Sequence, residues 1–289
     1  MNELTLEEEL TLEENLVWVC ASPRSGTTWL SKDLLSYNTL ILDEFHLDEH
    51  LAIPTVGVFD TTFKRRIDRH ANLESYLFSD KYKSTWLYYL RKLVLNRIYS
   101  QFQDLTKKII IKDPGNVGAY DITSQCFKNS RFIILLRDGR DIIDSLVDAL
   151  GDDGFISKGS DYVPITQEKR LAFIELRAKL WNNLTEILMR TYENHEPKLR
   201  TIIKYEELIQ NTFGIVKNLY EFLGVRINDD ILQQIVNKTK FQNIPIELRG
   251  KTKFYRSATP GKFREHFNNM ELDIMNEIMK NSLNKLGYL

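Results

Sequence analysis

The sequence predicts an α/β fold in three layers, with a central parallel β-sheet covered by helices on both faces. Short and almost wholly apolar runs recur along the chain, and such runs are typical of strands buried on both faces of a parallel sheet. Segments with apolar residues at helical spacing alternate with these runs, which favours strand–helix–strand units. Ligands of such sheets bind at the edge where the strands end, so we expect a site there.

The totals exclude several classes of protein. A chain of 289 residues is long enough for one large α/β domain with a sizeable core. A net charge of −1 lacks the basic excess of a nucleic-acid-binding domain. Cys20 and Cys126 give no disulfide framework and favour a reducing compartment. The acidic N-terminus does not resemble a signal peptide, and no apolar run reaches transmembrane length. We therefore expect a cytoplasmic protein with no transmembrane segment.

The chain is expected to form an arm and a single domain. Residues 1–15 contain a near duplication of an acidic motif, and we expect a solvated acidic arm. Residues 16–289 should form one domain, because no internal boundary is visible. A helical insert at about residues 60–107, rich in aromatic and basic side chains, is expected to roof a substrate pocket. Ordinary helical packing is the alternative explanation for those aromatic residues.

The elements follow from local pattern. The expected strands are 16–21, 39–42, 108–112, 131–137 and 199–205. The fourth is the most apolar and is expected in the centre of the sheet. The expected helices are 29–36, 121–129, 138–150, 168–192, 213–223, 229–236 and 268–286, and the expected long loops are 151–167 and 241–265.

The loop between the first strand and the first helix has the composition of a phosphate site. A glycine turn before a helix exposes backbone N–H groups to an anion. Arg24 adds a fixed charge, and Thr27 and Thr28 add hydroxyl donors. Thr27 stands where the G-x-x-x-x-G-K-[ST] motif of NTPases has its lysine. The loop therefore favours a nucleotide 5′-phosphate over a triphosphate with Mg²⁺, and an ordinary turn is the alternative.

The sequence from Pro23 to Trp29 resembles the 5′-phosphosulfate loop of sulfotransferases that use 3′-phosphoadenosine 5′-phosphosulfate (PAPS). Cytosolic members usually have lysine where this chain has Arg24, and arginine there resembles protein-tyrosine and many bacterial sulfotransferases. The resemblance implies a P-loop-like fold and places Trp29 near the adenine, although a core position for Trp29 stays open. The loop residues that it implies for the donor are Arg24, Ser25, Gly26, Thr27, Thr28 and Trp29.

A second motif follows the fourth strand. Arg137 ends that strand and Ser145 lies early in the next helix, so both could grip one phosphate. An ion pair of Arg137 with Asp138 or Asp141 explains the residues equally well. The segment is similar to the 3′-phosphate motif of sulfotransferases, and the resemblance gives Arg137 and Ser145 that role. A 3′-phosphate distinguishes PAPS from ATP.

Transfer of a sulfuryl group needs cations and a base. Charge develops on the bridging oxygen, which favours a cation there, and the acceptor must lose a proton. Arg24 of the phosphosulfate loop is one candidate cation. Lys112 is the other, because its Lys-Asp-Pro sequence resembles that of protein-tyrosine sulfotransferases. The alternative is that Lys112 pairs with Asp113 or extends its ammonium to solvent along the protein surface. The same resemblance implies that Glu44 is the base, with His46 second and a surface carboxylate as the alternative for Glu44.

Two later motifs support the donor site. Tyr205 begins a Tyr-Glu-Glu-Leu sequence similar to one in sulfotransferases, which implies a place beside the adenine, and a core tyrosine is the alternative. The loop from Arg256 to Phe263 is similar to the loop that closes over the 3′-phosphate, which implies contacts by Arg256, Gly261 and Lys262. Phe263 stands where the family usually has tryptophan, and a solvated basic loop is the alternative.

The predicted activity is transfer of a sulfuryl group from PAPS to a hydroxyl or amine, without a metal, releasing adenosine 3′,5′-bisphosphate (PAP). The acceptor is left open among a small molecule, a lipid, a carbohydrate and a peptide, and so is a homodimer. The alternatives are a P-loop kinase or NTPase, a non-catalytic nucleotide-binding module, and a structural protein with an accidental loop.

Overall fold

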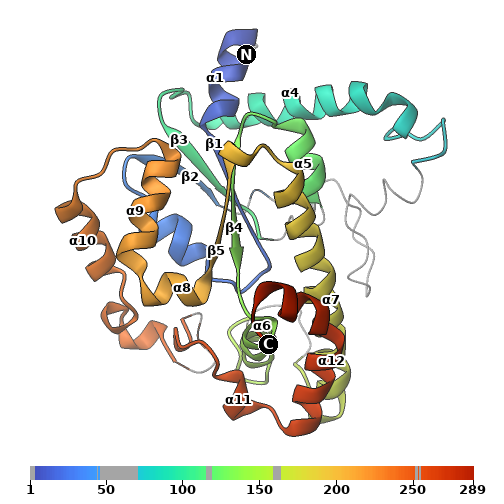
Figure 1. Ribbon diagram of the computed structural model, residues 1–289, viewed down its shortest axis with the longest axis vertical. Coiled ribbons are helices and arrows are strands. Elements are labelled where there is room, and N and C mark those ends of the chain that lie inside the picture. Colours follow the sequence, from blue (N-terminus) through green and yellow to red (C-terminus); the bar gives the residue numbers. More distant parts are fainter. Residues whose placement is uncertain are drawn as a thin grey trace.

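A computed structural model describes residues 4–43, 45, 71–114, 119–158, 164–250, 253 and 255–289. Five strands form an all-parallel sheet in the order β2-β3-β1-β4-β5 (Figure 1). The strands are β1 (Leu16–Ala21), β2 (Thr39–Asp43), β3 (Lys108–Lys112), β4 (Arg131–Leu136) and β5 (Arg200–Lys204). The predicted parallel sheet is confirmed, with β1 and β3 at their expected bounds.

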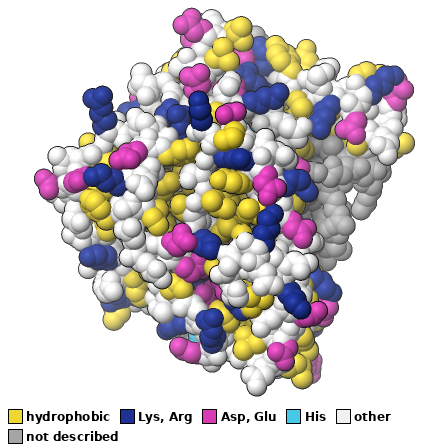
Figure 2. Space-filling model, in the orientation of Figure 1, with side chains coloured by type: hydrophobic (Ala, Val, Ile, Leu, Met, Phe, Trp, Pro, Cys, Tyr) yellow, Lys and Arg dark blue, Asp and Glu magenta, His cyan; other side chains and the backbone are white. Residues whose placement is uncertain are grey.

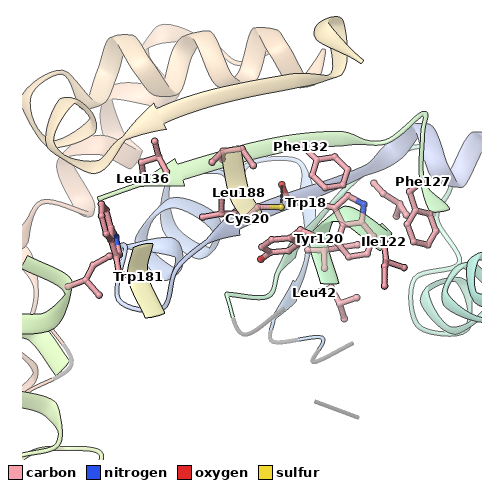
Figure 3. Packing of buried hydrophobic residues seen from close by; sticks show 14 of the residues in the cluster. Trp18, Cys20, Leu42, Tyr120, Ile122, Phe127, Phe132, Leu136, Trp181 and Leu188 are labelled. Atoms are coloured by element: carbon pink, nitrogen blue, oxygen red, sulfur yellow. Dashed lines mark hydrogen bonds between the residues drawn. The ribbon is translucent and has the colours of Figure 1, made fainter. Parts of the chain in front are cut away.

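Strand β1 occupies the middle of the sheet. All six of its residues are buried, and alternate side chains enter hydrophobic clusters on opposite faces. On one face Trp18 packs against Phe127 and Phe132, with ring centroids 5.3 and 6.3 Å away (Figure 3). The expectation that the 131–137 strand is central is wrong by one position, because β4 lies beside β1. The apolar run shows burial on two faces but does not give the strand order.

Helices cover both faces of the sheet. One hydrophobic cluster joins it to α4, α5, α6, α7 and α12, and the other joins it to η1, α8, α9 and α10; α9 and α12 lie on opposite sides in Figure 1. The longer helices are α1 (Leu6–Asn15), α4 (Lys83–Gln101), α6 (Gly139–Ala149), α7 (Gln167–Asn194), α9 (Thr212–Leu223), α10 (Asp229–Lys238) and α12 (Asn269–Leu286). The shorter ones are η1 (Trp29–Leu34), η2 (Asp80–Tyr82), α5 (Tyr120–Cys126), η4 (Pro197–Leu199), α8 (Tyr205–Gln210), η5 (Phe241–Asn243), η6 (Ile246–Leu248) and α11 (Phe263–His266). Three layers, as predicted, are therefore confirmed.

Several segments differ from expectation. The expected first helix is a six-residue π-helix, η1. Helix α8 was not expected, because its six residues are too few for a periodic pattern. The expected loop at 241–265 contains η5 and η6 and runs into α11. Of the insert expected at about 60–107, the described part from residue 71 holds η2 and α4.

Helix α1 is not a solvated arm, so that expectation is wrong. It begins with a capping box between Thr5 and Glu8. Glu9 and Glu13 each have a side chain that is 3% exposed, and both pair with Arg91 of α4 at 2.5 and 2.7 Å. The repeated acidic pattern thus places two carboxylates on the packed side of the helix, where the expectation had assumed water.

The outer surface carries charges of both signs. On the face seen in Figure 2, Lys and Arg side chains are interspersed with Asp and Glu. The balanced charge of the sequence is therefore also mixed locally on that face.

No described helix is both long enough and apolar enough to cross a membrane.

Candidate active site

A cavity of about 220 Å³ lies at the edge where β1, β3 and β4 end. Its described lining contains five cationic and two acidic side chains. These are Arg24, Lys112, Arg137, Arg256 and Lys262, against Asp141 and Asp144. Pro23, Gly26, Thr27, Thr28, Trp29, Ser145 and the 255–259 segment complete most of the wall. Because the cations outnumber the carboxylates, the cavity attracts an anionic ligand.

The loop after β1 is held in a conformation that only a glycine meets easily. Gly26 has a φ of +90°, and a Cβ there would lie 2.7 Å from the ring of Tyr205. Ser25 is 1% exposed, and its hydroxyl has no hydrogen-bond partner among the described residues. Helix η1 has only six residues, so charged side chains, more than a helix dipole, give the cavity its potential.

The two phosphate motifs meet directly. Since β1 and β4 are parallel neighbours, Arg24 reaches across to donate from Nε to Ser145 Oγ at 3.1 Å. Arg137 donates from Nη1 to the backbone oxygen of Arg24 at 2.8 Å, and its guanidinium lies 4.5 Å from the centroid of the Tyr205 ring. Burial, and then the charges of Arg137 and Arg256, lower the pKa of Arg24 to about 10, so an anion would relieve this repulsion.

The alternative ion pairs of Arg137 do not form among the described residues. Asp138 pairs with Arg140 at 2.7 Å. Asp141 accepts the backbone N–H groups of Gly261, at 2.7 Å, and Phe263, at 3.3 Å. The Nε of Arg137 is buried without a hydrogen-bond partner in the described part of the chain. Arg137 therefore retains a donor that a ligand could use.

Lys112 pairs with a carboxylate other than Asp113, which was the alternative partner. Its Nζ lies 2.8 Å from Oδ1 of Asp43, the last residue of β2. Sequence reasoning considered only the adjacent Asp113 and missed Asp43. The usable signal was that both residues end neighbouring parallel strands. Glu44 and His46, expected as base and second choice, lie outside the described residues.

The late loop is attached to helix α6 through carboxylates. Arg256 pairs with Asp144 at 2.6 Å and Asp148 at 2.5 Å. Gly261, at a φ of +84°, is fixed by the Asp141 contact, and Lys262 lines the cavity. Sequence reasoning missed Asp144 and Asp148. Their spacing from Asp141, three and seven residues, puts all three on one helix face.

A second hollow of about 770 Å³ adjoins the first. Trp29, Tyr255 and Ala258 line both hollows, and Phe241 lines only the second. Tyr205 is 7% exposed and lies outside both described linings. Its ring meets that of Trp29 edge-on at 6.2 Å, so Tyr205 supports the loop and Trp29 from behind. Sequence reasoning missed Phe241 and Tyr255.

The parallel sheet and its cationic edge define a class, an α/β protein that binds an anionic ligand where the strands end. Residues 17–229 match the model of the Sulfotransferase family. The chain therefore belongs to the sulfotransferase family, as the resemblance implied. The match includes both phosphate motifs and ends before the late loop.

Two curated relatives match this chain at low sequence identity. The chain is 24% identical to the protein-tyrosine sulfotransferase of Drosophila melanogaster over 238 residues, which cover 78% of this chain and 42% of that protein. It is 22% identical to a putative protein-tyrosine sulfotransferase of Caenorhabditis briggsae over 229 residues, covering 76% and 69%. Among solved structures, mouse sulfotransferase SULT7A1 complexed with PAP superposes with a TM-score of 0.55 at 16% identity, covering 96% and 89%. This similarity confirms the predicted fold.

Proposed function

We propose that the protein transfers a sulfuryl group from PAPS to a hydroxyl or amine of an acceptor and releases PAP. The observation that supports this most is the direct contact of the two phosphate motifs, Arg24 with Ser145, inside one cationic cavity. The absence of a Walker lysine at Thr27 argues against a kinase or NTPase. The similar mouse sulfotransferase is complexed with PAP, which supports the same nucleotide here.

The proposed donor lies across both hollows. Its 5′-phosphosulfate contacts Arg24, Thr27 and Thr28, and its 3′-phosphate contacts Arg137, Ser145 and Lys262, which all line the first hollow. Its adenine enters the second hollow beside Trp29. Because Arg256 and Gly261 are already engaged by carboxylates, the late loop contributes mainly through Lys262. Ser25, Gly26 and Tyr205 shape the loop that meets the phosphosulfate.

The proposed chemistry is one displacement at sulfur. The acceptor oxygen or nitrogen forms a bond to sulfur while the bond from sulfur to the bridging phosphate oxygen breaks, and the leaving group is PAP. Arg24 stabilises the charge that develops on that oxygen, and Lys112 contacts the sulfuryl group while it is transferred. These cations make a metal ion unnecessary in this proposal. Glu44 is proposed as the base that takes the acceptor proton, on the resemblance alone, with His46 as the second choice.

A tyrosine hydroxyl is the first acceptor to test, because both curated relatives are named protein-tyrosine sulfotransferases. Other peptides, small molecules, lipids and carbohydrates follow. We propose a cytoplasmic location, in line with the free and buried cysteines Cys20 and Cys126.

The deciding experiment is titration calorimetry with PAP and, separately, with ATP and Mg²⁺. We expect PAP to bind without metal and Arg137→Ala to weaken it by about 10- to 100-fold, since hydrogen bonds to charged groups contribute about 1.5–3 kcal/mol. Arg131→Ala is the matched control, because Arg131 begins β4, the strand that Arg137 directly follows, and donates to the backbone oxygens of Phe222 and Glu14, outside the cavity lining. Preference for ATP with Mg²⁺, or an Arg137 variant that binds PAP normally, would refute the proposal.

A further inference from the structure

Three charged side chains form a row beside the cavity. The Asp43 carboxylate accepts from Lys112 Nζ at Oδ1, 2.8 Å away, and pairs through Oδ2 with Lys32. The Lys112 side chain is 4% exposed, that of Asp43 31% and that of Lys32 43%. One carboxylate therefore links a buried ammonium with an exposed one.

The sheet itself creates this contact. Asp43 and Lys112 are register partners at the ends of the parallel strands β2 and β3, and paired residues of neighbouring strands project to the same face. Lys32 comes from η1, on the chain that leaves the phosphate loop. The row thus connects β2, β3 and η1 at one edge of the cavity.

Lys112 needs a partner at this place. It lines the cavity with Arg24, Arg137, Arg256 and Lys262, and the nearby carboxylates Asp141 and Asp144 are engaged by the late loop. Burying an ammonium without a counter-charge is costly. A lysine ammonium also moves freely on its four-carbon stem unless it is held.

The charge of Asp43 suits this task. Burial by itself raises the pKa of Asp43, but the hydrogen bonds and charges of Lys112 and Lys32 outweigh it, so the pKa lies below its ordinary value. Asp43 stays ionised at neutral pH. It is not among the described residues that line the cavity, so its negative charge does not oppose an anionic donor directly.

We propose that Asp43 is a positioning residue that fixes the ammonium of Lys112 toward the transferring sulfuryl group, and that Lys32 holds Asp43 in place. This inference rests on the proposed function, in which Lys112 contacts the group that PAPS has and PAP lacks. Asp43 acts on the donor through Lys112, because its Oδ1 is bonded to that ammonium and Asp43 is not among the described residues that line the cavity.

The test compares the affinities of PAPS and PAP by calorimetry in the wild type, Asp43→Asn, Lys112→Met and the double variant. Asparagine keeps the shape of aspartate and removes its charge. We expect Asp43→Asn to lower the affinity for PAPS by about tenfold, which is the effect of losing one charge-assisted hydrogen bond, and to leave the affinity for PAP unchanged. In the Lys112→Met background, Asp43→Asn should change the PAPS affinity by less than about twofold, because contacting residues are not additive.

Two controls define the outcome. Asp229→Asn removes a carboxylate from the exposed pair with Lys217 and should change neither affinity. Lys32→Gln should weaken PAPS by less than Asp43→Asn does. The inference is overturned if Asp43→Asn lowers the affinities for PAPS and PAP equally or raises the affinity for PAPS. It is also overturned if Asp43→Asn lowers the PAPS affinity as much in the Lys112→Met background as in the wild type. Failure of the wild type to bind either nucleotide would instead refute the proposed function, and with it this inference.

Discussion

Substitution of Gly26 by alanine should disable the phosphate loop. Gly26 has a φ of +90°, where an L-residue is strained, and its new Cβ would lie 2.7 Å from two carbon atoms of the Tyr205 ring. Tyr205 has little room to retreat, because it is 7% exposed and its ring lies against Arg137 and Trp29. The variant must therefore move the loop, the tyrosine or both.

The magnitude has two parts. A left-handed backbone costs a residue other than glycine about 1–2 kcal/mol. Forcing one carbon into a packed contact costs about 1–3 kcal/mol more. For Gly26→Ala we therefore expect a loss of about 2–5 kcal/mol in the free energy of unfolding, if the loop keeps its conformation. If the loop moves instead, the affinity for PAP should fall by about tenfold for each 1.4 kcal/mol of binding free energy that is lost.

Gly224→Ala is the matched control. Gly224 has a φ of +71° after helix α9, and a Cβ there would have no described atom within 4 Å. It carries the backbone cost without the contact and lies outside the cavity lining. Urea unfolding gives the stability of each variant, and calorimetry gives its affinity for PAP. The difference between the two alanine variants isolates the contact with Tyr205.

Equal stability losses in the two variants, together with normal PAP binding by Gly26→Ala, would refute this reasoning. A smaller side chain at Tyr205 should relieve part of the effect. Gly26→Ala combined with Tyr205→Leu is therefore expected to recover stability relative to Gly26→Ala with an unchanged tyrosine. Failure of that relief would show that the ring is not the obstacle.

Two further predictions concern regions away from the cavity. Arg91→Ala should lower the free energy of unfolding by about 3 kcal/mol in urea titrations, because it leaves the buried carboxylates Glu9 and Glu13 without their main partner; a loss under about 1 kcal/mol would contradict it. Burial, aided by the charge of Arg200, lowers the pKa of His195 from 6.5 although its bond to Ser130 opposes this. Folding therefore opposes the protonation of His195. The contribution of neutral His195 to the free energy of unfolding is fully present above pH 6.5 and is lost as the pH drops through the lowered pKa. His195→Gln should reduce the difference in urea stability between about pH 7.5 and about pH 5.5, and an unchanged difference would contradict this.

Local sequence determined the elements that carry the site. The apolar runs of β1 and β3 and the glycine of the loop after β1 are visible in short stretches of the sequence, so pattern and spacing identified them. The two phosphate motifs also follow directly from strand ends, which is why Arg24 and Ser145 could be placed at one sheet edge before their contact was known. The model of the Sulfotransferase family matches the same region.

Tertiary structure decided which charged groups pair. The ammonium of Lys112 is bonded to Asp43, which lies 69 positions away along the chain, whereas sequence reasoning considered the adjacent Asp113. Arg256 is held by Asp144 and Asp148 of α6, more than 100 positions earlier. These partners depend on strand order, register and the packing of helices on the sheet. The energy of an ion pair depends on how far apart in space the two charges lie and on how deeply they are buried. A short-range sequence pattern therefore cannot predict which distant residues will pair.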